Sequence, residues 1–327
     1  MTKPSQRAVP TTTPDAVAAH ALAHAWAQVG AALSPHPDCP LPDWAGGGDT
    51  LHQHLLVIGN GGDDDPVSQL CYLETAAARF GKVGYVGPAS VRRLVEWSMG
   101  DRVVVLSRMP RDVSDWDLRC ALGSLARTLG PQATHAHAGR PFLRVATTAA
   151  RHWRDRLAAA AQHGLCVGLA GLDTLDGMPR TTPPLAPLLG VPGVSWVPLG
   201  RPGVFARDAA PPETVDWIDW RADCDDLADE ASLIDNLDLV IALDAAHAHM
   251  ASGLGVPVWR LSATRLTTSH DDDWQATPFP CRRENSPTLA DIGAFRLSPS
   301  SEDWPGVVNA AATALLAMAT EFQGWTR

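Results

Sequence analysis

The sequence lacks several features that would place a protein in a class at once. None of its apolar runs reaches about 18 residues, so no membrane span is indicated, and no apolar segment typical of a signal peptide follows the N-terminus. Its 26 lysines and arginines are outnumbered by 36 aspartates and glutamates, which gives a formal net charge of −10. This charge argues against a non-specific nucleic-acid surface. We expect a cytoplasmic protein without a nucleic-acid partner.

Motifs of two large enzyme classes are also missing. There is no Gly-x-Ser-x-Gly, the motif of many serine hydrolases. The glycine-rich stretch 59–65 reads Gly-Asn-Gly-Gly-Asp-Asp-Asp, which is not the dinucleotide-binding pattern. The six cysteines form no Cys-x-x-Cys pair, which favours buried free thiols in a reducing compartment. Lysine is scarce while alanine, arginine and proline are plentiful, a composition typical of a GC-rich bacterial genome.

What is present is the composition of a globular protein with two domains. The chain has 327 residues, with 45% apolar and 19% charged residues, and one hydrophobic core rarely serves that length. Strands alternate with helices, which predicts α/β architecture. The predicted strands are 54–58, 83–86, 102–106, 165–169, 194–199 and 215–220. The predicted helices include 15–32, 67–80, 89–98, 116–129, part of 141–162, 185–189, 226–236 and 305–322.

One segment, 237–262, organises the second half. Residues 237–243 form an almost continuous apolar run, which is typical of a parallel strand covered on both faces. Asp244 ends this run, 245–254 has helical composition, and Gly255 stands where a helix C-cap belongs. A second strand at 256–261 completes a βαβ unit. In open α/β sheets ligands bind at the carboxyl ends of strands beside helix N-termini, which is where Asp244 falls.

The stretch 226–259 resembles the C-terminal half of heptosyltransferase-like glycosyltransferases, above all the form that follows tetratricopeptide repeats in bacterial proteins. It runs Asp-Leu-Ala-Asp-Glu-Ala-Ser-Leu-Ile-Asp-Asn-Leu-Asp-Leu-Val-Ile-Ala-Leu-Asp-Ala-Ala-His-Ala-His-Met-Ala-Ser-Gly-Leu-Gly-Val-Pro-Val-Trp. Weaker similarity extends over about 54–300. The resemblance implies a GT-B fold, in which two Rossmann-like domains face each other across a cleft and a C-terminal helix returns to the first domain. The implied divisions are 1–50 (flexible terminus plus helix), 51–162 (acceptor domain), 163–303 (nucleotide-sugar domain) and 304–327 (C-terminal helix).

The resemblance also implies the site residues. Asp65 holds the place of the catalytic base that accepts the acceptor's proton. The implied donor-binding residues are Arg180, Asp229, Asp244, Ala245, Ala246, His249 and Trp274. No metal and no cofactor are expected, because a helix N-terminus with basic side chains can stabilise a leaving diphosphate, and the nucleotide sugar is a co-substrate.

Several residues depart from the family pattern and leave alternatives open. Ala245 replaces a Thr or Ser whose hydroxyl can reach a phosphate, Glu230 replaces a Thr, and His247 replaces a Val. The acidic run 63–65 fits a catalytic base, an Asp-x-Asp magnesium site or a solvated turn. Asp244 fits a ligand-binding group or a simple N-cap, and His249 fits a phosphate ligand or a packed helix residue.

The sequence therefore predicts a metal-independent glycosyltransferase that moves a sugar from a nucleotide-diphosphate sugar to a glycan or protein acceptor. The alternative is a catalytically inactive GT-B protein with a binding or assembly role, which the departures favour. A third interpretation, a nucleotide-sugar epimerase of similar fold, predicts conversion of the free donor without any acceptor.

Overall fold

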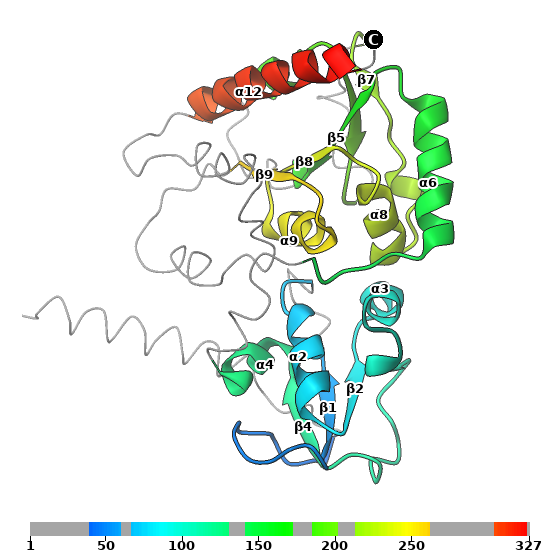
Figure 1. Ribbon diagram of the computed structural model, residues 1–327, viewed down its shortest axis with the longest axis vertical. Coiled ribbons are helices and arrows are strands. Elements are labelled where there is room, and N and C mark those ends of the chain that lie inside the picture. The colour runs from blue at the N-terminus through cyan, green and yellow to red at the C-terminus, as the bar shows by residue number, and fades with distance from the viewer. Residues whose placement is uncertain are drawn as a thin grey trace, which may run out of the picture. The chain divides into compact units, whose positions relative to one another are not determined.

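The computed structural model describes residues 39–59, 67–130, 141–172, 185–201, 213–261 and 304–325. Within the compact unit 40–327 they form two parallel sheets with helices packed against them (Figure 1). The first sheet has the order β3-β2-β1-β4, with β1 His54–Ile58, β2 Lys82–Val86, β3 Val104–Leu106 and β4 Leu118–Ala121. The second has the order β7-β6-β5-β8-β9, with β5 Leu165–Ala170, β6 Val194–Pro198, β7 Asp216–Trp217, β8 Leu239–Ala242 and β9 Val258–Arg260.

The helices between the strands follow the predicted alternation. They are α2 Cys71–Arg79, α3 Ala89–Met99, α4 Leu122–Leu129, α6 Thr147–Ala160, α7 Ala186–Leu189, α8 Leu227–Ile234, α9 Ala245–Leu254 and α12 Trp304–Trp325, with short 3₁₀ turns at Gly100–Arg102 and Arg221–Asp223. Of the helices in the described segments, none is long and apolar enough to cross a membrane. The predicted helix at 15–32 lies outside the described residues.

The central strand of the second sheet is buried on both faces. All six residues of β5 are buried, and they alternate between two apolar clusters. Leu165, Val167 and Leu169 join a cluster with α7 and α12, while Cys166 and Ala170 join one with α8 and α9. β8 alternates in the same way. The continuous apolar run at 237–243, predicted to be a strand covered on both faces, is confirmed.

The C-terminal helix corrects one detail of the expected fold. α12 packs against α7, and its apolar side joins the same buried cluster as β5 and β8 through Val307, Val308, Ala311, Leu315 and Ala319 (Figure 1). The described part of this helix therefore covers the second sheet instead of returning to the first domain. The reason is local, because an amphipathic helix lies where its apolar stripe finds the uncovered face of a sheet.

One assignment in the middle of the chain also differs from the prediction. The helix predicted at 116–129 begins only at Leu122, because Leu118–Ala121 pairs with β1 as the edge strand β4. Arg119 of this strand is 8% exposed and pairs with Asp43, which lies outside the strand, at 2.8 Å. Further along the chain, α6 packs against α8 (Figure 1).

Candidate functional site

The chain changes direction in the second sheet between two neighbouring strands. From β5 the chain continues to β6 and β7 on one side, and from β8 it continues to β9 on the other. The carboxyl ends of such a pair form the place where open α/β sheets bind ligands. Gly171 and Asp244 meet there: Gly171 has φ +73°, and a Cβ atom at this position would lie 2.6 Å from both the Asp244 nitrogen and its Oδ2. Only glycine lets the two strand ends approach so closely.

Asp244 is the N-cap of α9. Its Oδ1 accepts a hydrogen bond from the His247 backbone N–H at 2.8 Å, and its Oδ2 lies 2.8 Å from His247 Nδ1. The N-cap interpretation of Asp244 is therefore what the structure shows. The N–H groups of Ala245 and Ala246, the first two in the helix, have no acceptor within it, and both residues are partly exposed. They are the groups through which this helix end can bind an anion.

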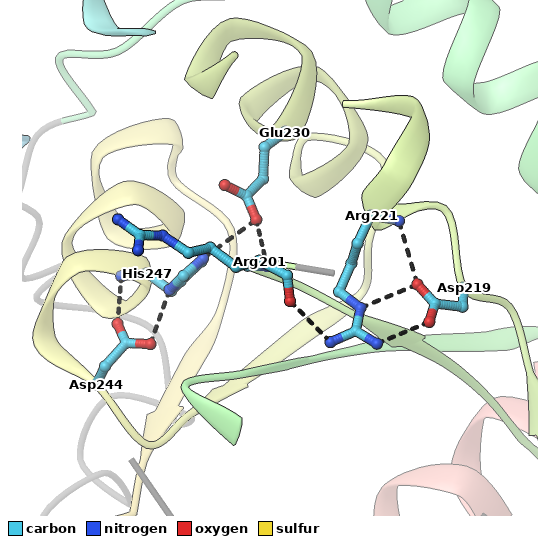
Figure 2. Close-up of polar contacts among 7 residues, drawn as sticks. Arg201, Asp219, Arg221, Glu230, Asp244 and His247 are labelled. Carbon is cyan, nitrogen blue, oxygen red and sulfur yellow. Dashed lines mark hydrogen bonds and ion pairs between the residues drawn. The ribbon is translucent and has the colours of Figure 1, made fainter. Parts of the chain in front are cut away.

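His247 lies between two carboxylates (Figure 2). Its Nδ1 faces Asp244, and its Nε2 lies 3.1 Å from Glu230 Oε1 on α8. The Glu230 side chain is 10% exposed and that of His247 is 15% exposed, so water screens this interaction weakly. The same Glu230 oxygen accepts the Gly200 N–H at 2.6 Å. One buried ion triad therefore joins α8, α9 and the turn after β6.

The triad keeps its imidazole charged. Burial alone lowers the pKa of His247, but the charge of Glu230 and the hydrogen bonds to Asp244 and Glu230 outweigh it and raise the pKa to about 10. Burial alone raises the pKa of Glu230, but the charge and hydrogen bond of His247 hold it below its usual value. The pKa of Asp244 is likewise lowered, against burial, by His247 and by the charge of Arg260. At neutral pH the triad holds one cation and two anions.

A second charged pair, the buried Arg221 and the exposed Asp219, lies on the other side of the same turn. Arg221 is 6% exposed. Its Nε donates to Asp219 Oδ1 at 2.9 Å and its Nη2 donates to Asp219 Oδ2 at 2.7 Å. The remaining Arg221 nitrogen, Nη1, donates to the carbonyl oxygen of Arg201 at 3.1 Å (Figure 2). The pKa of Asp219 is lowered mainly by this hydrogen bonding to Arg221.

The structure brings together only part of the predicted site. Asp244, Ala245, Ala246 and His249 share the first half of α9, and His249 is partly buried. Asp229 is held elsewhere: its Oδ2 lies 2.7 Å from Arg93 Nη2 on α3. The donor-binding roles of these five residues stay predictions. Three further predicted residues, Asp65, Arg180 and Trp274, lie outside the described residues.

Sequence reasoning missed one contact and two residues that shape this edge of the sheet. It noted Glu230 and His247 as separate departures, but not that they contact each other; Arg201 and Arg221 were not singled out. A usable signal was present, because two opposite charges replace two neutral residues in adjacent helices. Over the segments that the structure describes, no group of three or more His, Cys, Asp or Glu side chains could hold a metal ion.

Comparison with solved structures supports the fold. No protein-family model and no curated protein matches the sequence. Among solved structures, a family 9 glycosyltransferase from Veillonella parvula DSM 2008 matches with a TM-score of 0.53 and 10% identity, over 83% of this chain and 99% of that one. This likeness identifies the class: the chain has the fold of the GT-B glycosyltransferases.

Two other solved structures are similar but match less well. Escherichia coli ADP-heptose LPS heptosyltransferase II has a TM-score of 0.44 and 14% identity, over 64% of this chain and 84% of that one. The iron-containing dodecameric glycosyltransferase TibC of enterotoxigenic E. coli H10407 has a TM-score of 0.46 and 10% identity, over 85% of this chain and 78% of that one.

Proposed function

We propose that this chain is a heptosyltransferase-like glycosyltransferase that moves a sugar from a nucleotide-diphosphate sugar to a glycan or protein hydroxyl without a metal. It would act in the cytoplasm, consistent with the five described cysteines, which are all free thiols. The donor would occupy the edge of the second sheet, and the acceptor would lie against the first domain. The GT-B fold supports the reaction class.

A single observation carries the proposal. A capped helix, α9, starts where the chain changes direction between β5 and β8, and its first N–H groups lie at that edge. An anion placed there gains hydrogen bonds and the partial positive charge of the helix end. A leaving nucleoside diphosphate is such an anion, and its developing charge is what a transferase of this kind must stabilise.

The proposed reaction is a direct displacement. Asp65 takes the proton of the acceptor hydroxyl, and the acceptor oxygen forms a bond to the anomeric carbon. The bond from that carbon to the diphosphate oxygen breaks, and the nucleoside diphosphate leaves with both electrons. Asp65 follows β1 in the sequence, just as Gly171 follows β5 in the second domain.

Nucleotide titration tests the donor site. We expect at least one of ADP, GDP and UDP to bind with a dissociation constant below millimolar. Tryptophan fluorescence or calorimetry measures this binding. Ala245→Glu should weaken that binding at least ten-fold, because it adds a negative charge beside the diphosphate, while it should preserve the helix, since acids favour helix N-termini. The matched control Ala245→Gln has the same shape without the charge and should bind far better than the Glu variant. No binding of any of the three nucleotides at millimolar concentration would refute the proposal.

A catalytically inactive binding protein is the second candidate. It is favoured by Asp244 and Asp229, whose carboxylates are both engaged by protein groups. The two candidates differ in an assay that follows nucleoside diphosphate release from a bound nucleotide sugar over a panel of acceptors. Release that needs both an acceptor and Asp65 identifies the transferase. Conversion of the donor without an acceptor would instead identify an epimerase.

A further inference from the structure

The backbone of the turn after β6 is held more firmly than a connecting loop requires. Its two peptide groups at Gly200 and Arg201 are fixed from opposite sides by buried charged side chains. Glu230 accepts the Gly200 N–H at 2.6 Å, and Arg221 donates to the Arg201 carbonyl at 3.1 Å. Charge-assisted hydrogen bonds of this kind are stronger than neutral ones, so the backbone of the turn has little freedom.

The two supporting side chains are themselves fixed. Glu230 is held by His247, and Arg221 is held by both oxygens of Asp219. A functional group is presented accurately when the residues beneath it are locked in this way. The arrangement suggests that the exposed side chain of the turn has to be kept in one place.

That side chain is Arg201, and its guanidinium is an available cation. Its residue is exposed, and in Figure 2 the side chain extends from the turn toward α9. The turn lies against α9, since a Cβ on Gly200 would be 3.4 Å from His247 Cε1. In the part of the chain that the structure describes, no carboxylate forms an ion pair with Arg201. By contrast, Arg221 and Arg93 are both engaged by aspartates.

We propose that Arg201 is a phosphate-binding residue of the donor site, which contacts the diphosphate of the nucleotide sugar, and that Glu230 and Arg221 are its positioning residues. This inference rests on the proposed function. A guanidinium suits the task because it is always charged and can donate two parallel hydrogen bonds to phosphate oxygens. Arg201 would add a side-chain cation to a helix end at which Ala245 offers only its backbone.

The test separates phosphate from nucleoside recognition. Wild type, Arg201→Gln and Arg201→Lys are titrated with inorganic pyrophosphate, with ADP, GDP and UDP, and with the matching nucleosides. We expect Arg201→Gln to weaken diphosphate binding about ten- to hundred-fold, the range for a lost hydrogen bond to a charged group, and to leave nucleoside binding unchanged. Arg201→Lys should fall between. Arg151→Gln, at an exposed position of α6, is the control and should bind like wild type.

A second measurement tests the positioning role. Arg221→Lys removes the hydrogen bond to the Arg201 carbonyl and should weaken diphosphate binding in the wild-type background. In the Arg201→Gln background the same change should have little further effect, which a merely structural role would not produce. If the wild-type protein binds nucleotides and Arg201→Gln binds diphosphates equally well, this inference is overturned and the proposed function stays intact. Absence of nucleotide binding by wild type would overturn both.

Discussion

Replacing His247 by valine should destabilise the protein strongly, and a second replacement, Glu230→Thr, should return much of the lost stability. His247 is the only cation that the described structure places between Glu230 and Asp244. Removing one partner of a buried ion pair costs about 3–5 kcal/mol, because the remaining charge stays buried without compensation. His247→Val leaves two such carboxylates, so we expect a loss of that size.

The other two variants of this double-mutant cycle have smaller expected costs in stability. Glu230→Thr alone should cost about 1–3 kcal/mol, since it removes the acceptor of the Gly200 N–H and of His247 Nε2 but leaves the imidazolium paired with Asp244. Replacing both members by neutral residues removes the buried charge pair, an exchange that is often close to neutral. The double variant should therefore be more stable than His247→Val by about 2 kcal/mol or more.

Urea unfolding at pH 7, monitored by tryptophan fluorescence and circular dichroism, measures the free energy of unfolding of wild type, the two single variants and the double variant. The exposed pair of Lys82 and Asp115, at 3.9 Å, supplies the control, since Asp115→Asn should cost less than about 1 kcal/mol. If the two single costs simply add in the double variant, or if His247→Val costs less than the control, the triad does not hold these helices together.

Three further outcomes follow from the same region. Because the pKa of His247 is raised, its stabilising charge is fully present below about pH 6.5 and is lost as the pH rises through about 10. Between pH 7 and 10 the melting temperature of wild type should therefore fall more than that of the Glu230→Thr/His247→Val variant. Gly171→Ala should lower the melting temperature, because a Cβ there lies 2.6 Å from Asp244, whereas Gly123→Ala in α4, with open space around it, should not. Ala245→Ser should tighten nucleotide binding about five-fold in calorimetry, the effect of one added hydrogen bond of about 1 kcal/mol.

The fold could be predicted where local pattern and burial agree. β1 has the predicted bounds, 54–58, and β8 falls inside the predicted run at 237–243, because strands covered on both faces leave a continuous apolar signature. β4 could not be predicted, since Leu-Arg-Cys-Ala carries no such signature. It becomes a strand through pairing with β1 and through Asp43, which is 76 residues from Arg119 in the sequence.

The candidate site was predictable in place but not in its internal contacts. Asp244 lies between β8 and α9 as predicted, because the end of an apolar run and the start of a helix are local features. The contact between Glu230 and His247 joins residues that are 17 positions apart and depends on how α8 packs against α9. A single sequence gives no direct measure of that packing, so the two substitutions looked like independent losses.

Glu230 and His247 act together at the site, because they form one ion pair. Where the heptosyltransferase-like pattern that 226–259 resembles has a neutral pair, Glu230 and His247 supply one negative and one positive charge, so the net charge beside α9 matches that of the pattern while His247 stays protonated. This pair therefore does not weaken the case for an anion site, as one acidic substitution alone would. Ala245 still lacks a hydroxyl, but the same ion pair fixes the turn that presents Arg201. The departures from the family pattern are thus compatible with a rebuilt phosphate site, and Arg201→Gln and Ala245→Ser are the two variants that distinguish rebuilding from loss.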